Sequence, residues 1–234
     1  IIASFNKVAE KKAVRIFSRI TKKIIITNVL EAEMVKLISN SWRYIQFASA
    51  NQFFMICSQH NINFNRIRKI MTDSYARGEG LPGAGFAAGP CLLKDTMQLY
   101  AFSKNIFTMG NVSMSINEGM PAFVIDQLKS KFDLKKKKVG ILGMSFKANI
   151  DDKRDSLSYK ILNILKYISK KVYCSDEFIK EENFVLKQKL IKESDIIIIA
   201  TPHDAYKNLK FPKNKIVVDI WSLYNNEKNH FKKY

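Results

Sequence analysis

The feature that most constrains this chain is the stretch from Asn28 to Ser58, which contains no Gly or Pro. Asn28 can cap a helix, and Glu31 three residues later completes a capping-box pattern. The stretch predicts one helix of about 30 residues, roughly 45 Å long. Its apolar residues surround much of the helix, so it needs cover on several sides. A helical subunit interface would supply that cover, and we expect a homodimer through the helix at residues 29–58.

Shorter elements are predicted around this helix. Apolar spacing indicates a helix over residues 5–20 and another over 61–71, with a short strand at 24–26. The only stretch rich in Gly and Pro, residues 78–90, is expected to be a loop.

Two further helices are predicted after the loop. Asp95, with Gln98 three residues later, is the expected N-cap of the first. We expect Gly110-Asn111 to end that helix. The second then continues to about Phe132, with Pro121 near the start of its regular part.

The second half of the chain alternates strands with helices. Apolar runs predict strands at 139–143, 172–174, 195–200 and 216–219, and helical patterns lie at 156–169 and 183–192. This alternation is typical of a parallel sheet with helices on both faces. We therefore expect an α/β protein, with a helical domain over residues 1–133 and a small Rossmann-like domain over 134–234.

Charge alone suggests a polyanion partner, because 39 Lys and Arg face 21 Asp and Glu, a net charge of +18. The basic residues are mostly Lys and are dispersed, without interleaved aromatic residues. The densest run, Lys135 to Lys138, is either a solvated strand entry or a phosphate patch. We expect no nucleic-acid partner.

Other composition features indicate a cytoplasmic protein. No apolar run reaches the roughly 18–20 residues that cross a bilayer, and the first residues do not resemble a signal peptide. The three cysteines are too few and too scattered for a disulfide framework, which favours a reducing compartment. We expect no membrane association.

Residues 83–95 carry the most informative chemistry. Small residues in the loop allow a ligand to approach the backbone, and Cys91 follows just before a predicted helix start. A helix N-terminus and the nearby Lys94 both favour the thiolate form of a cysteine. The residues themselves leave two readings open, a reactive thiol or a buried structural cysteine.

Lys36 and Asn40 share one face of the long helix, because they are four residues apart. They form either part of a solvated stripe or a cation and an amide directed at a developing oxyanion. The second reading gains weight if Cys91 faces them.

Loops of the second half also carry candidate residues. Lys147 and Arg154 follow the first strand of the predicted sheet and could bind a pyrophosphate at its carboxyl edge. No GxGxxG loop occurs there, so a dinucleotide site of the usual kind is not indicated. His203 follows another strand, where a loop-capping role is expected, and no His or Cys cluster has metal-ligand spacing.

Three ordered motifs resemble the UDP-glucose/GDP-mannose dehydrogenase family of NAD-dependent nucleotide-sugar 6-dehydrogenases. They are Glu31 to Asn40, Gly89 to Asp95, and Gly140 to Lys147 followed by Arg154-Asp155-Ser156. The resemblance covers nearly the whole chain. It implies a central helical dimerisation domain and a UDP-binding α/β domain. The family's NAD-binding Rossmann domain should precede Ile1, so we expect these 234 residues alone not to complete a turnover.

The resemblance also implies roles for individual residues. In the family, a sugar CH2OH is oxidised to a carboxylate with two NAD+. The implied catalytic residues are the nucleophile Cys91, the oxyanion-stabilising pair Lys36 and Asn40, and Asp95 for proton transfer or hydrolysis. The residues implied to bind the UDP-sugar are Phe86, Gly89, Lys94 and Lys147. Arg77 is implied to contribute to the substrate site of the partner subunit. Arg154 is implied to reach NAD.

The chain departs from the family pattern in places. Phe86 is followed by two Ala where glucose-type members have two Gly, which leaves the sugar open. An arginine that some members use has no match near Asp219 to Ser222. The alternative is a truncated, inactive protein that binds nucleotide sugars or serves oligomerisation.

Overall fold

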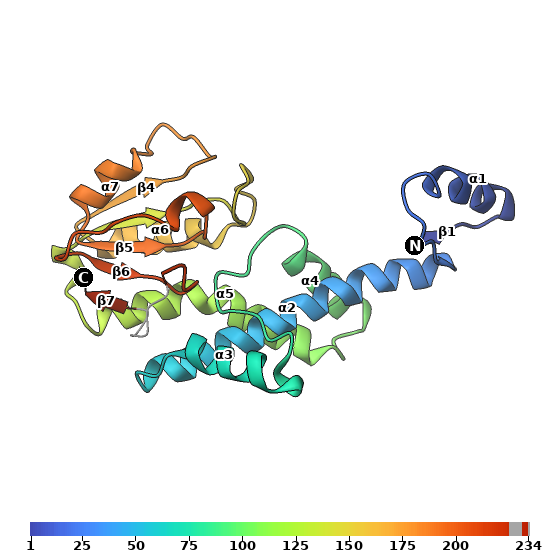
Figure 1. Cartoon of the computed structure of the whole chain (residues 1–234), viewed down its shortest axis with the longest axis horizontal. Helices are drawn as coiled ribbons and strands as arrows, with labels where there is room; N and C mark the ends of the chain where they lie inside the picture. The colour runs from blue at the N-terminus through green and yellow to red at the C-terminus, as the bar shows by residue number, and fades with distance from the viewer. Residues whose placement is uncertain (225–230, 234) are drawn as a thin grey trace.

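The computed structural model describes residues 1–224 and 231–233 and has an elongated shape (Figure 1). The first half comprises β1 (Ile2–Ala3), α1 (Lys7–Phe17), β2 (Ile26–Thr27), α2 (Val29–Gln59), α3 (Phe64–Ser74), the 3-10 turn η1 (Ala76–Gly78), α4 (Leu92–Phe102) and α5 (Thr108–Lys129). The second half comprises η2 (Leu134–Lys136), β3 (Lys138–Leu142), α6 (Leu157–Ile168), β4 (Lys171–Ser175), α7 (Lys187–Glu193), β5 (Ile196–Ile199), η3 (Asp204–Tyr206), β6 (Ile216–Val218) and β7 (Phe231–Lys233).

The long helix α2 runs as predicted. The Asn28 side chain accepts the N–H of Glu31 at 2.8 Å and caps the first turn. All buried residues of α2 lie from Ser41 onward. Both α4 and α5 pack against this helix. Its first turns extend away from the body of the molecule (Figure 1).

Helices α4 and α5 begin elsewhere than the sequence pattern predicted. The prediction of Asp95 as N-cap is wrong, because α4 begins a turn earlier with Cys91 at that position. The predicted break at Gly110 is also wrong. The chain turns between α4 and α5 instead, where Lys104 and Asn105 have positive φ, and the ring of Phe107 packs over Gly110.

Pro121 lies in the interior of α5 rather than near its start. Proline removes one hydrogen bond from a helix, which costs about 3 kcal/mol in an isolated helix interior. Around it, Met120, Val124 and Leu128 are completely buried. Burial of these side chains offsets the lost hydrogen bond and keeps the helix continuous.

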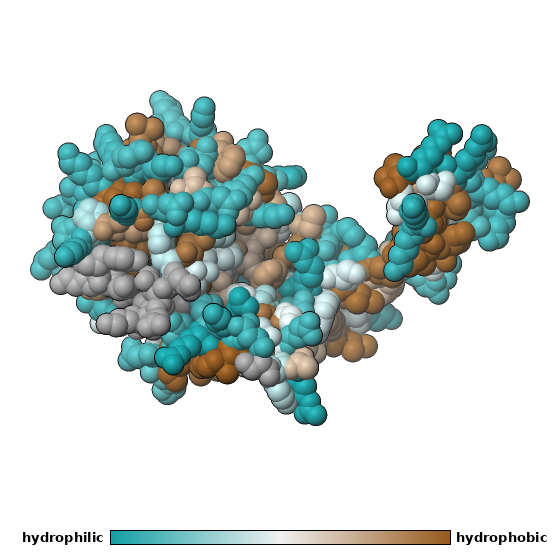
Figure 2. All heavy atoms as spheres, viewed as in Figure 1, coloured by the Kyte–Doolittle hydropathy of each residue, from teal (hydrophilic) through white to brown (hydrophobic). Residues whose placement is uncertain are grey.

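Residues 2–27 form a small βαβ unit at the far end of α2 (Figure 1). Strands β1 and β2 pair in parallel over two residues each. Helix α1 buries none of its residues, and Phe5, Val8 and Ile20 are 92%, 66% and 77% exposed. Figure 2 shows this apolar surface on the unit at the right.

The second half is built on a sheet in the order β4-β3-β5-β6-β7, confirming the predicted parallel arrangement for its first four strands. Strand β7, which was not predicted, pairs antiparallel with β6. Ile141 and Ile198 face a core that includes residues of α5 and α6, whereas Ile197 shares the opposite face with Leu190 of α7. The first of these cores continues into the helical half, so the two halves pack as one body.

Asp176 and His203 join the loops at the carboxyl edge of this sheet. The Asp176 carboxylate accepts N–H bonds from Met144 and Ser145, at 2.5 and 3.1 Å, and lies 3.2 Å from His203 Nε2. Burial opposes its ionisation, but these hydrogen bonds outweigh burial and lower the pKa of Asp176 to about 2. His203 Nδ1 accepts the N–H of Asn149 at 2.9 Å, so His203 ties the loops together as expected.

Candidate active site

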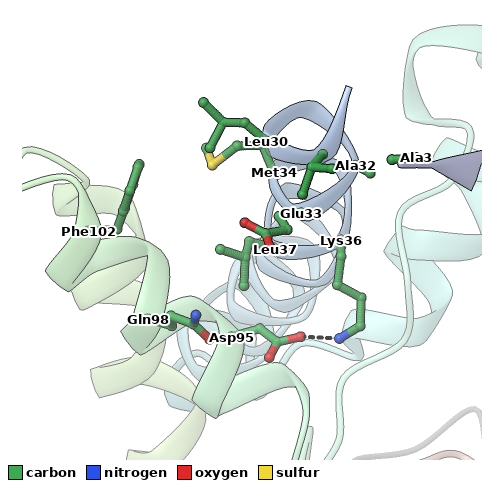
Figure 3. A pocket seen from close by; sticks show the side chains of 11 residues that line it. Ala3, Leu30, Ala32, Glu33, Met34, Lys36, Leu37, Asp95, Gln98 and Phe102 are labelled. Carbon is green, nitrogen blue, oxygen red and sulfur yellow. Dashed lines mark hydrogen bonds and ion pairs between the residues drawn. The ribbon is translucent and has the colours of Figure 1, made fainter. Parts of the chain in front are cut away.

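Lys36 and Asn40 of α2 converge on Asp95 in the first turn of α4. Figure 3 shows the contact between Lys36 and Asp95. Lys36 Nζ and Asn40 Nδ2 each donate to Asp95 Oδ2, at 2.5 Å in both cases. The two side chains share a helix face because they lie one turn apart, and the close packing of α2 and α4 brings Asp95 to them.

Asp95 is the buried member of this group. Its side chain is 4% exposed, against 60% for Lys36. Burial alone would raise the pKa of Asp95, but the bonds from Lys36 and Asn40 outweigh it and lower the pKa below the ordinary value. The same bond raises the pKa of Lys36. The result is an ionised pair with an exposed cationic end.

A cavity of about 630 Å³ borders this pair. Figure 3 shows Leu30, Met34 and Leu37 of α2 on one side and Gln98 and Phe102 of α4 on the other. The Lys36–Asp95 contact lies at its edge, so a polar group of a ligand entering from this side would meet the ammonium.

Cys91 is the exposed thiol among the three cysteines. It is the N-cap of α4, and its side chain makes no capping bond. A negative charge on its thiolate would favour the charged forms of Lys36 and Arg154 and so raise the pKa of each. Cys57 and Cys174 are buried instead, and burial raises the pKa of both, that of Cys174 to about 12. The reading of Cys91 as a buried structural residue is therefore wrong.

The loop before Cys91 is anchored in the protein interior. Phe86 is 3% exposed and belongs to the core, while Gly89 has a φ of +111° that favours glycine. The buried Asn51 of α2 accepts the N–H of Gly85 at 2.9 Å. Sequence reasoning missed Asn51. Its one signal was an amide on a helix of otherwise largely apolar character.

The four remaining predicted residues are all exposed. Lys94 lies with its Nζ 3.9 Å from Asp95 Oδ1, Lys147 follows β3, and Arg77 lies on η1. The Arg154 guanidinium folds onto the Asp152 carboxylate, with bonds of 2.6 to 3.0 Å. The structure thus joins Lys36, Asn40 and Asp95 through direct contacts, with Cys91 nearby, and keeps Arg77 on a separate turn.

A dinucleotide does not fit the loop that follows β3. In Rossmann folds the backbone N–H groups of the loop after the first strand bind the pyrophosphate. Here the backbone N–H groups of Met144 and Ser145 in that loop already donate to the Asp176 carboxylate.

The described residues contain no group of three or more His, Cys, Asp and Glu placed to hold a metal ion. None of their helices is both long enough and apolar enough to cross a membrane.

Fold and site together define a class: a helical body with an exposed thiol beside a cation, joined to a Rossmann-like domain. Comparison with known proteins narrows this class. A sequence model described as the central domain of the UDP-glucose/GDP-mannose dehydrogenase family matches residues 30–118, and one for the UDP binding domain of that family matches residues 140–226. The chain belongs to this family.

Individual relatives agree with this assignment. The chain is 29% identical over 231 residues to UDP-N-acetyl-D-mannosamine dehydrogenase of Pyrococcus horikoshii, covering 94% of this chain and 55% of that protein. It is 32% identical over 249 residues to the protein of the same name from Methanococcus maripaludis strain C7, covering 100% of this chain and 57% of that protein. The solved structure of UDP-D-ManNAc dehydrogenase from Pyrococcus horikoshii superposes with a TM-score of 0.78 at 28% identity. The match covers 87% of this chain and 50% of that one. The chain spans about half the length of these relatives.

We predict that Lys36→Met raises the pKa of Asp95, because the buried carboxylate then loses a charged donor. The lowered pKa stabilises the fold above the unfolded-state value of about 3.9, and this stability disappears as pH falls through the folded value. The variant should therefore be less stable than the native chain at neutral pH, because it lacks part of this contribution to the free energy of unfolding. Titration of the Asp95 carboxyl carbon by NMR measures the shift directly.

Lys94→Met is the matched control, because Lys94 is 3.9 Å from Asp95 and mostly exposed. It should raise the pKa of Asp95 less than Lys36→Met does. Equal shifts in the two variants would show that general surface charge, and not the Lys36 contact, sets this pKa.

Proposed function

We propose that this chain forms the catalytic-thiol and nucleotide-binding parts of an NAD-dependent nucleotide-sugar 6-dehydrogenase. The observation that carries the proposal is the exposed Cys91 at the start of α4, close to the Lys36–Asp95 pair. We take residues 1–133 as the helical domain and 134–234 as the UDP-binding domain. Matches to the family's central and UDP-binding domains support this division.

The proposed substrate is a UDP-linked 2-acetamido sugar. Support comes from relatives named UDP-N-acetyl-D-mannosamine dehydrogenase, which align with nearly all of this chain. The sequence Phe86-Ala87-Ala88, which departs from the glucose-type pattern, is compatible with a different sugar.

Cys91 is the proposed nucleophile. Its thiolate adds to the carbon of the sugar aldehyde and forms a thiohemiacetal, and loss of a hydride from that carbon leaves a thioester. Water then attacks the thioester carbonyl, which releases the carboxylate and returns the thiol. NAD, when bound, would accept the hydride in each of the two oxidations.

Lys36 and Asn40 are the proposed stabilisers of negative charge on the reacting oxygen. Both donors now contact Asp95, whose buried carboxylate holds them in place near Cys91. An ammonium held in this way stabilises an alkoxide without first having to reorganise. Asp95 is also the proposed acceptor of a proton from the water that hydrolyses the thioester.

The nucleotide is proposed to lie at the carboxyl edge of the second sheet. Lys147 follows β3 there, and its exposed ammonium is free to bind the diphosphate. Phe86, Gly89 and Lys94 would shape the sugar side. Arg154 would have to leave Asp152 to approach NAD, and the exposed Arg77 would serve the substrate site of a partner subunit.

A homodimer is proposed through the exposed apolar face of α2. Ile38 and Trp42 are 52% and 56% exposed, and they line a largely apolar cavity of about 420 Å³ with Leu99, Ile106 and Phe107. We propose that the same face of a second copy covers it. The dimer would then bury on the order of 1,200 Å² or more, as stable interfaces do.

We predict that the 234-residue chain binds UDP and that Lys147→Ala weakens this binding by about 1.5–3 kcal/mol, through loss of a charge-assisted contact. Isothermal calorimetry measures both affinities. Lys189→Ala, an exposed lysine of α7, should bind UDP like the native chain. Native affinity in the Lys147 variant would remove that residue from the site.

We predict that Cys91→Ser lowers turnover to the carboxylate by roughly 10³-fold or more, because a serine hydroxyl is a much weaker nucleophile at neutral pH. The assay needs a protein in which these residues accompany an NAD-binding domain. Cys57→Ala, at a buried position, should retain turnover. Near-native turnover in the Cys91 variant would refute the covalent mechanism through this thiol.

We predict that Trp42→Asp shifts the chain from dimer to monomer, because a carboxylate would have to be buried in the apolar interface. Sedimentation velocity at micromolar concentration distinguishes the two states. Leu186→Asp, at a 78% exposed position of the second domain, should stay dimeric. A native chain that sediments as a folded monomer would rule out this interface.

A further inference from the structure

Two aromatic rings of the second half press on glycines of the loop before Cys91. A Cβ at Gly85 would lie 2.2 Å from Cζ3 of Trp221, and one at Gly89 would lie 2.6 Å from Cδ2 of Phe146. Contacts this short exclude any side chain at either position unless the ring moves. Both rings come from the edge where the nucleotide is proposed to bind, since Phe146 follows β3 and Trp221 follows β6.

Trp221 is itself held in place. Its Nε1–H donates to the carbonyl of Ala200 at 3.2 Å, and its ring meets the buried ring of Phe86 edge to face, with centroids 6.4 Å apart. Ala200 directly follows β5, so the ring is fixed relative to the sheet.

A buried amide chain holds Gly85 by its backbone. Asn51 accepts the Gly85 N–H and donates to Asn117 Oδ1 at 2.9 Å, and Asn117 donates to the carbonyl of Tyr44 at 3.0 Å. Both amides are at most 1% exposed. Gly85 is thus fixed by α2 and α5 through its N–H and by the second domain through Trp221.

We propose that Phe146 and Trp221 position the Cys91 loop, so that nucleotide binding at the sheet edge is coupled to the exposure of the Cys91 thiol. The inference rests on the proposed nucleotide site at Lys147. Lys147 is the neighbour of Phe146, so a diphosphate that holds Lys147 also restrains the backbone that carries the ring. That ring contacts Gly89, two residues before Cys91.

Alkylation of Cys91 by iodoacetamide tests the coupling in the 234-residue chain. Mass spectrometry of the Cys91 peptide gives the rate with and without UDP, and the buried Cys57 and Cys174 serve as internal references. We expect saturating UDP to slow Cys91 alkylation about fivefold, the low end of typical coupling between sites. UDP lacks the hexose that a UDP-sugar would place beside the thiol.

Phe146→Ala should abolish the effect of UDP on alkylation while UDP still binds by calorimetry. Phe146→Leu is the milder variant if the alanine variant does not fold. Tyr167→Ala, which removes an 89% exposed ring of α6, should respond to UDP like the native chain. Slowing that persists in the Phe146 variants would indicate direct shielding and overturn the coupling, as would UDP binding without any change in the native rate.

A double-mutant cycle tests Trp221 without using UDP. Gly85→Ala should displace the loop and change the Cys91 alkylation rate, because the added methyl group meets the Trp221 ring. In a Trp221→Leu background the methyl group has room, so Gly85→Ala should have a smaller effect there. Additive effects would overturn the positioning role. Failure of UDP to bind would instead contradict the proposed nucleotide site, and this cycle would still decide the role of Trp221.

Discussion

The arrangement of the molecule depends on hydrogen bonds made by one face of α2. Lys36 and Asn40 hold Asp95 of α4, the Asn117 amide of α5 donates to the carbonyl of Tyr44, and Asn51 holds the loop at Gly85. These residues follow helical spacing, so one rigid element sets the positions of two helices and a loop. Each contact is buried or partly buried, where a missing partner would be costly.

The same helix connects to the second domain through α5. The Tyr44 hydroxyl donates to Glu118, and Lys160 of α6 pairs with the same carboxylate. An apolar core runs from Phe54 of α2 to Ile141 of the sheet. The loops at the carboxyl edge of that sheet are therefore held at a defined place relative to Cys91, as the proposed reaction between a nucleotide sugar and the thiol would require.

The site combines opposite degrees of exposure. Asp95 is buried and ionised, whereas Lys36 and Cys91 reach solvent. The buried carboxylate of Asp95 orients the Lys36 ammonium and leaves it accessible to solvent. Asp176 illustrates the contrasting case, since its carboxylate is used entirely in joining loops.

Local sequence determined most of the elements and pointed to the candidate site. The Asn28 cap started α2, alternation of apolar runs predicted the parallel sheet, and the segment around Cys91 identified the thiol, because each depends on neighbouring residues along the chain. Tertiary packing decided the rest. Asp95 contacts Lys36 rather than capping α4, Pro121 is accommodated inside α5, and Trp221 rests on Gly85. These outcomes join residues far apart in the chain, and the free energy that selects them comes from burial and partner geometry that exist only once the helices and the sheet have packed.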